Sequence, residues 1–253
     1  MKRKLLVLTL LSAAVLSVGA AVSYNAMITA IYGSGNPNTG WTADSSNGIT
    51  LALRGKDRIS ASTANTSGMY GPYAVGTDPA NSNRSTWNWD FSINSGSVPL
   101  NTYDYYVAID TDRSQCINYT VVDALTNWTD SSYGFSTTAN GQGVEGTSGP
   151  PNDYAATYTV VQQSQNLTFI GGNPNLPGTY NYELFAVEKG DGPGGVRLAS
   201  VGIKVVVGSG GAVCNVPTDK NQCKNDGWSS MTRLDASPFK NQGDCIQYVN
   251  TGK

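Results

Sequence analysis

The chain has 253 residues, a formal net charge of −2 and no histidine. The missing histidine excludes Ser-His-Asp and Cys-His catalytic groups and His-ligated zinc, so any catalysis would have to use carboxylates or a Ser-Lys pair. Lys and Arg do not cluster beyond residue 4, which argues against nucleic acid and anionic membrane surfaces as partners, because both are bound through concentrated positive charge.

The first residues have the pattern of a secretory signal peptide. Residues 2–4 are Lys-Arg-Lys, and they precede an apolar run from Leu5 to Val18 and a group of small residues. We place the cleavage after Ala20; this leaves 13 basic and 18 acidic residues, a net charge of −5. No later stretch reaches the ~20 apolar residues of a membrane span. We therefore expect a secreted, extracellular protein of bacterial type, with no transmembrane segment in the mature chain.

The mature chain is rich in Gly, Ser, Thr, Asn and Tyr, which favours strands and turns over helices. The clearest strand is 86–93, where Trp87, Trp89, Phe91 and Ile93 alternate with polar residues and so share one face. Other segments give weaker or shorter strand signals. They are 105–109 and 117–122, a hairpin of 180–187 and 196–207 around a Gly-rich turn at 189–195, and the candidates 25–32, 49–54 and 154–161.

These segments predict about eight strands in an all-β, immunoglobulin-like two-sheet sandwich. Long polar loops are expected at 60–85 and 125–153. The predicted organisation is a signal peptide (1–20), a β-sandwich domain (21–207), a Gly-rich hinge (208–213) and a Cys-containing tail (214–253).

Two segments resemble known bacterial exoprotein modules. Pro177-Gly178-Thr179-Tyr180 opens a strand and resembles the late strand of immunoglobulin-like and cadherin-like domains, where a Pro-Gly turn precedes a Tyr at a sheet corner; the resemblance covers 177–207 and implies architecture alone. Residues 223–228 read Cys-Lys-Asn-Asp-Gly-Trp and 239–245 read Phe-Lys-Asn-Gln-Gly-Asp-Cys. They resemble a short C-terminal disulfide module of bacterial secreted proteins, with Asp226 where that pattern more often has Gly. This resemblance implies export and a stapled tail, and no particular activity.

Four cysteines allow three pairings. We favour Cys223 with Cys245 inside the tail module, which leaves Cys116 to pair with Cys214 and tie the base of the tail to the sandwich. A cysteine-only metal site is the competing interpretation, but the spacings lack a Cys-x-x-Cys knuckle, and exported thiols usually oxidise.

Asp110 and Asp112 follow the 105–109 strand and permit two functional interpretations. Oxygen ligands in such turns can hold Ca²⁺, although the third acid and the Gly of an EF-hand loop are missing. In extended chain their carboxylates would lie roughly 6–7 Å apart, near the separation used by inverting glycosidases. A solvated turn, in which Asp and Ser accept backbone N–H groups, explains the same residues and is the interpretation that we favour.

Several aromatic residues lie in polar, loop-like sequence, and sugar C–H faces stack on such rings. Trp41, Tyr70, Tyr73 and Trp128 are therefore the candidate ligand-binding residues. The interpretation that we favour for them is that they cap the ends of the sandwich. Together the sequence predicts a non-enzymatic binding or structural module of the bacterial cell surface or extracellular matrix, possessing no resident cofactor unless Ca²⁺ binds. The partner would be a surface or matrix component such as a polysaccharide. A carbohydrate-active protein, either a sugar-binding module or a carboxylate-dependent glycoside hydrolase, is the alternative.

Overall fold

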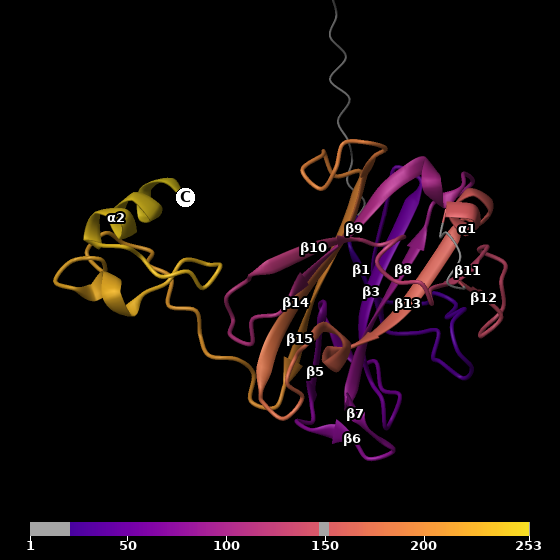
Figure 1. Cartoon of the computed structure of the whole chain (residues 1–253), viewed down its shortest axis with the longest axis horizontal. Coiled ribbons are helices and arrows are strands. Elements are labelled where there is room, and N and C mark those ends of the chain that lie inside the picture. Colours follow the sequence, from indigo (N-terminus) through magenta and orange to yellow (C-terminus); the bar gives the residue numbers. More distant parts are fainter. Residues whose placement is uncertain (1–20, 147–151, 253) are drawn as a thin grey trace, which may run out of the picture.

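The computed structural model describes residues 21–146 and 152–252, and the predicted signal peptide lies outside them. Within these residues the chain forms a two-sheet sandwich and a small tail beside it (Figure 1). Sheet A has the strand order β1 (Ser23–Ala26), β2 (Trp41–Ser46), β3 (Ile49–Asp57), β8 (Trp87–Asn94), β13 (Val160–Asn166), β11 (Ser132–Gly134) and β12 (Val144–Glu145). Sheet B has the order β10 (Tyr119–Asp123), β9 (Tyr103–Asp110), β14 (Gly178–Glu188), β15 (Ala199–Val207), β5 (Met69–Tyr73) and β4 (Asn65–Thr66).

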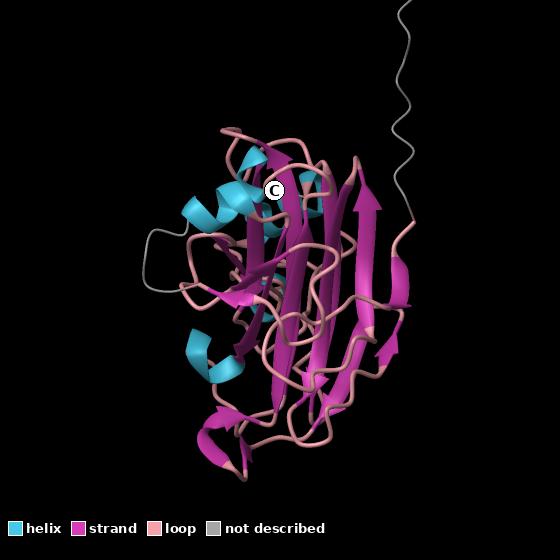
Figure 2. Ribbon diagram, turned by 90° about the vertical axis from the view of Figure 1, so that its right-hand side faces the viewer, coloured by secondary structure: helices cyan, strands magenta, loops and turns pink. Residues whose placement is uncertain are grey.

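All described strand pairs are antiparallel except β5 with β15, which is parallel. The remaining strands, β6 (Thr77–Asp78) and β7 (Asn81–Ser85), form a separate hairpin. The helices are short (Figure 2): α1 (Asn152–Thr157), α2 (Gln242–Thr251), η1 (Leu100–Thr102), η2 (Leu167–Ile170) and η3 (Gly227–Ser230). None of the described helices has the length and apolar character needed to cross a membrane.

The core lies between the two sheets and is built around the predicted aromatic strand. Trp87 and Trp89 of β8 are fully buried, and the Trp89 ring stacks on Tyr182 of β14 at 4.6 Å between ring centroids. Trp87 packs in turn against Tyr180, at 5.6 Å. The alternation of residues 86–93 therefore predicted the buried face correctly, and the all-β two-sheet class is confirmed. Its immunoglobulin-like character stays a prediction.

Several predicted element boundaries were wrong. The predicted strand at 25–32 ends at Ala26, because Asn25 has a positive φ of 58° and the pairing with β2 is irregular. The candidate at 154–161 divides into helix α1 and the start of β13. The supposed loops 60–85 and 125–153 carry short strands, and β2 was not predicted at all. Short strands give too few alternations to stand out from polar loop sequence.

The tail has its own small core. Cys223 and Cys245 form a disulfide and pack with Phe239, and all three are buried. Helix α2 begins after Asn241, whose side chain accepts the Asp244 N–H, and it ends at Gly252 in the left-handed conformation. A unit of this size buries little apolar surface, so the crosslink is needed to hold it together. The predicted pairing of Cys223 with Cys245 is confirmed.

The predicted hinge is held against the sandwich. Cys214 forms the second disulfide with Cys116, which confirms the other predicted pairing. Next to this disulfide, Gln115 N–H donates to the Ala212 carbonyl oxygen at 2.7 Å. A Cβ at Gly211 would lie 1.9 Å from the Arg113 carbonyl oxygen, so only glycine allows the chain to approach so closely here. Gly211 therefore allows the segment after β15 to pack closely against the sandwich.

Candidate functional site

The two outer faces of the sandwich differ in what covers them. On sheet A, the segment between β1 and β2 lies over the outer face and buries Ala30 and Tyr32 against Trp41 and Ala52. On sheet B, exposed side chains such as Tyr119, Val121 and Met69 remain on the outside. Phe185, Val187 and Ala108 are buried together on another part of this face. Among the described residues, the part around Tyr119 and Met69 is therefore the strand surface that is available to a ligand.

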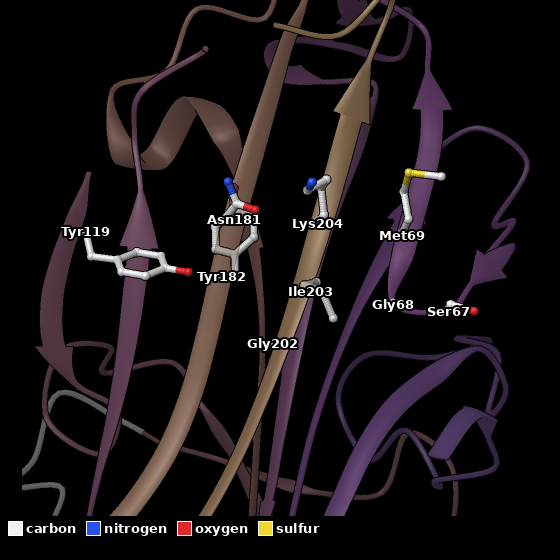
Figure 3. A pocket seen from close by; sticks show the side chains of 9 residues that line it. All are labelled: Ser67, Gly68, Met69, Tyr119, Asn181, Tyr182, Gly202, Ile203 and Lys204. Carbon is white, nitrogen blue, oxygen red and sulfur yellow. The ribbon is translucent and has the colours of Figure 1, made fainter. Parts of the chain in front are cut away.

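A groove of about 340 Å³ crosses this outer face. It is lined by residues of β10, β14, β15 and the turn before β5 (Figure 3): Ser67, Gly68, Met69, Tyr119, Asn181, Tyr182, Gly202, Ile203 and Lys204. None of these described lining residues is an acid, and the volume lies within the range typical of small-ligand sites. We call this feature the sheet B groove.

Strand register places the side chains of the sheet B groove in one row. Tyr119 of β10 lies opposite Asp110 of β9, and Asp110 accepts the Asn181 side-chain N–H from β14 at 3.0 Å. Asn181 lies opposite Lys204 of β15, and Lys204 lies opposite Met69 of β5. Because alternate residues of a strand share a face, this row brings an aromatic ring, an amide and an ammonium group together on the outside.

The floor of the groove is open at Gly202. Gly202 is exposed and lies on β15, two residues before Lys204 and opposite Glu183 of β14. A Cβ built on it would meet only the Tyr182 carbonyl oxygen, at 3.6 Å. A larger side chain there would occupy the groove without a backbone clash. The glycine is therefore what leaves space above the strands at this point.

Charged groups surround the Tyr119 ring. The ring is 38% exposed, so it is both supported by the sheet and accessible to a ligand. Burial, with the nearby carboxylates of Glu183 and Asp110, raises the pKa of Tyr119 to about 12. Its hydroxyl therefore stays protonated at neutral pH and is able to donate a hydrogen bond. Among the ion pairs of the described residues, none involves Lys204.

The aromatic residues chosen from the sequence lie elsewhere, and their expected exposure was wrong for three of the four. Trp41 is fully buried, with the Arg54 guanidinium 4.2 Å from its ring centroid. The Tyr70 hydroxyl is buried and donates to the Gly40 carbonyl at 2.7 Å, while Tyr73 stacks on Trp87. Trp128 is half-buried and packs edge-on against Trp89. These rings complete the core, which was the other interpretation of the same residues.

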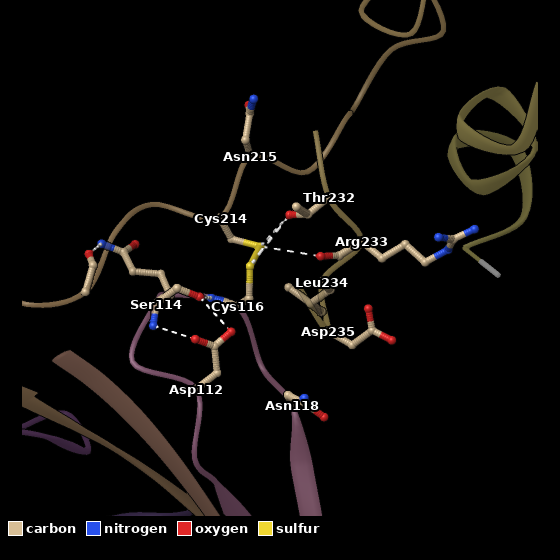
Figure 4. The surroundings of a disulfide bond; sticks show 12 residues. Asp112, Ser114, Cys116, Asn118, Cys214, Asn215, Thr232, Arg233, Leu234 and Asp235 are labelled. Carbon is tan, nitrogen blue, oxygen red and sulfur yellow. Dashed lines mark hydrogen bonds between the residues drawn. A yellow bond between two sulfur atoms is a disulfide. The ribbon is translucent and has the colours of Figure 1, made fainter. Parts of the chain in front are cut away.

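Asp110 and Asp112 are engaged by their own turn. Asp110 Oδ1 accepts the N–H groups of Asp112 and Asn118, at 3.0 and 3.2 Å. Asp112 accepts both the N–H and the hydroxyl of Ser114 beside the Cys116–Cys214 disulfide (Figure 4). Burial raises the pKa of Asp110 above its ordinary value, although these donors oppose the shift. The arrangement is that of a hydrogen-bonded turn.

We expect millimolar Ca²⁺ to leave the melting temperature unchanged. The carboxylate oxygens of Asp110 and Asp112 already accept protein N–H and O–H groups, and no group of three or more His, Cys, Asp or Glu residues suited to a metal occurs among the described residues. Thermal unfolding followed by circular dichroism, with Ca²⁺ and then with a chelator, measures this. A rise with Ca²⁺ that the chelator reverses would show a cation site that this turn geometry does not suggest.

No protein-family model, characterised protein or solved structure shows a significant match to this chain. The resemblance of the tail to an exported disulfide module therefore stays a prediction. Sequence inspection missed the sheet B groove because Tyr119, Asn181, Lys204 and Met69 are far apart along the chain. The only local signal is an outward glycine, Gly202, within an otherwise alternating strand.

Proposed function

We propose that the protein is an exported, non-enzymatic binding module of the bacterial cell surface or extracellular matrix, and that it holds a polysaccharide segment in the sheet B groove. The observation that carries the proposal is the row of Tyr119, Asn181 and Lys204 on an uncovered sheet face above the open position at Gly202. An accessible ring offers a stacking surface to the C–H face of a sugar. The Lys204 ammonium group offers hydrogen bonds to its hydroxyls, and the Asn181 side chain, whose N–H donates to Asp110, offers its carbonyl oxygen as an acceptor.

Two further features support this function. The carboxylates beside the groove are already engaged: Asp110 accepts N–H groups of its own turn and of the Asn181 side chain, and Glu183 accepts the Ser200 hydroxyl and pairs with Arg197. Asp112, the other acid considered for glycoside hydrolysis, likewise accepts hydrogen bonds within its own turn. Both features favour binding over hydrolysis, because hydrolysis of this kind needs two free carboxyl groups facing one substrate. Export is supported by the signal-like head and by two disulfides, which persist in oxidising compartments.

We expect the mature protein to be retained on at least one polysaccharide, and we expect Tyr119→Ala and Gly202→Leu to weaken that retention about 10-fold, or ~1.4 kcal/mol. The first variant removes the ring and the second fills the groove. Sedimentation with insoluble cellulose, chitin, starch and peptidoglycan, together with affinity electrophoresis in soluble glucans, gives the retained fraction.

The matched control is Gly194→Leu, which adds the same side chain in the turn between β14 and β15, where a Cβ meets no atom within 4 Å. It should bind as the unaltered protein does. Equal retention of all three variants would show that the ligand lies outside the sheet B groove. No retention on any of these polymers would contradict the polysaccharide assignment.

A further inference from the structure

A lysine and an asparagine are held in contact beneath the segment that covers sheet A. Lys56 of β3 points to the outer face of sheet A and is 7% exposed. Its Nζ donates to Oδ1 of Asn36, which belongs to the segment between β1 and β2, at 2.5 Å. The amine of one chain segment thus lies against the carboxamide of another.

The carboxamide is fixed in place by its neighbours. Asn36 Nδ2 donates to the Tyr32 carbonyl at 2.9 Å, and the backbone carbonyl of Asn36 accepts the side-chain N–H of Asn140 at 2.8 Å. Gly33 has a φ of +58°, and a Cβ there would lie 2.9 Å from Asn36 Nδ2. The turn therefore leaves little freedom to the carboxamide, whose oxygen accepts a hydrogen bond from Lys56 Nζ, and such a restrained contact is the condition for a reaction between two side chains.

A buried carboxylate completes the group. Asp90 of the adjacent strand β8 is fully buried, and its Oδ2 lies 3.7 Å from Lys56 Nζ. The Tyr32 ring shields the amine from the other side, at 5.3 Å from its centroid. Burial lowers the pKa of Lys56 although Asp90 opposes the shift, so the neutral, nucleophilic amine forms more readily than in water.

We propose that Lys56 and Asn36 become joined by an intramolecular isopeptide bond, with Asp90 as the group that moves the proton. Asp90 accepts a proton from the Lys56 ammonium, and the Nζ lone pair attacks Cγ of Asn36. The Nζ–Cγ bond forms, the Cγ–Nδ2 bond breaks, and the protons released from Nζ pass to Nδ2, which leaves as ammonium. The reaction balances without an oxidant, a reductant or a cofactor.

The residue after Asn36 removes the usual competing reaction. Asparagine can lose ammonia by ring closure onto the following backbone nitrogen, but residue 37 is proline, which has no N–H. Loss of ammonia from Asn36 therefore requires another nucleophile, and Lys56 Nζ is in contact with its carboxamide. The bond would covalently fix the covering segment to β3, over the buried cluster of Arg54 and Asp90.

The test is the intact mass of the purified mature protein after reduction of its disulfides. We expect a mass about 17 Da below that of the sequence, the mass of one ammonia, and a crosslinked peptide that contains residues 36 and 56. Asn36→Ala and Lys56→Arg should restore the full sequence mass. The matched control Lys204→Arg, at a lysine outside the cluster, should keep the deficit.

Two results would overturn the proposal. One is a full sequence mass for the unaltered protein, a measurement that depends on no variant folding. The other is a deficit that persists in Lys56→Arg. Asn47 and Asn140 are each followed by glycine and would also lose ammonia by ring closure, but hydroxylamine cleaves those products and leaves an isopeptide bond intact. Treatment with hydroxylamine before the mass measurement therefore separates the two sources.

Discussion

Replacing Arg54 by methionine is expected to lower the free energy of unfolding by about 3–5 kcal/mol. The change removes the guanidinium and leaves the Asp90 carboxylate buried beside an uncharged side chain. Both side chains are fully buried, and Arg54 Nε donates to Asp90 Oδ2 at 2.8 Å. The guanidinium also donates to the carbonyl oxygen of Thr39 at 3.0 Å and lies over the Trp41 ring. Urea unfolding followed by tryptophan fluorescence measures the loss.

The matched control for this prediction is Arg58→Met. Arg58 Nε donates to Asp78 Oδ2 at 3.1 Å, so the bond resembles that of Arg54, but 25% of the Arg58 side chain is exposed. Solvent replaces a lost partner at such a site, and the loss of stability should be much smaller. Equal losses of unfolding free energy in Arg54→Met and Arg58→Met would mean that the destabilisation does not depend on the burial of the Arg54–Asp90 pair.

The dependence on pH provides a second check of the same prediction. Burial raises the pKa of Asp90, but the charges of Lys56, while it is a free amine, and of Arg54 outweigh burial and hold that pKa below its ordinary value. The bond proposed between Lys56 and Asn36 would leave this role to Arg54. A carboxylate of this kind stabilises the folded state above its unfolded pKa of roughly 3.9, and that stabilisation is lost as the pH falls through the folded pKa. The difference in stability between the unaltered protein and Arg54→Met should therefore be constant near neutral pH and shrink in acid.

The sandwich was predictable where apolar and polar residues alternate along a strand, even though the polar face of β8 is itself buried. Residues 86–93 alternate strictly, and their four apolar side chains are buried between the sheets. The hairpin of β14 and β15 was predicted for the same reason and for its glycine-rich turn. Strand β3 gave a weaker signal and β2 was not predicted, because apolar residues also occupy their outer face: Trp41, Ala43 and Ala52 pack there against the covering segment and interrupt the alternation.

The candidate sites were not predictable from one sequence, because each of them depends on contacts between distant segments. Trp41 follows Asn38-Thr39-Gly40, which reads as an exposed loop until that loop is seen to lie over sheet A with Arg54 beneath it. The row from Tyr119 to Lys204 exists only through the register of β10, β9, β14 and β15. The contact between Asn36 and Lys56 likewise needs the fold of the covering segment. The disulfide pairing could be predicted because a compact tail needs its own crosslink, which left one other pair.

The second large effect is expected at the disulfide between Cys116 and Cys214. Its cysteines are 98 residues apart, and β10 to β15 lie between them, so the bond restricts a large part of the unfolded sandwich. Chain entropy for a loop of this length predicts that Cys116→Ala/Cys214→Ala loses about 4–5 kcal/mol of unfolding free energy. The tail would also lose its crosslink to the sandwich, beside the hydrogen bond from Ile117 N–H to the Leu234 carbonyl, and would stay attached through the backbone alone.

The control double variant, Cys223→Ala/Cys245→Ala, separates a global effect from a local one. That bond spans 22 residues and lies within the tail, so its loss should leave urea unfolding of the sandwich nearly unchanged while trypsin cleaves rapidly after Lys224 and Lys240. The Cys116→Ala/Cys214→Ala variant should show the opposite pattern: a sandwich that unfolds at lower urea, and a tail whose own disulfide still resists trypsin. If both variants weakened the sandwich equally, the two units would unfold as one, and the contacts at Gln115 and Ile117 would couple them more strongly than the disulfide does.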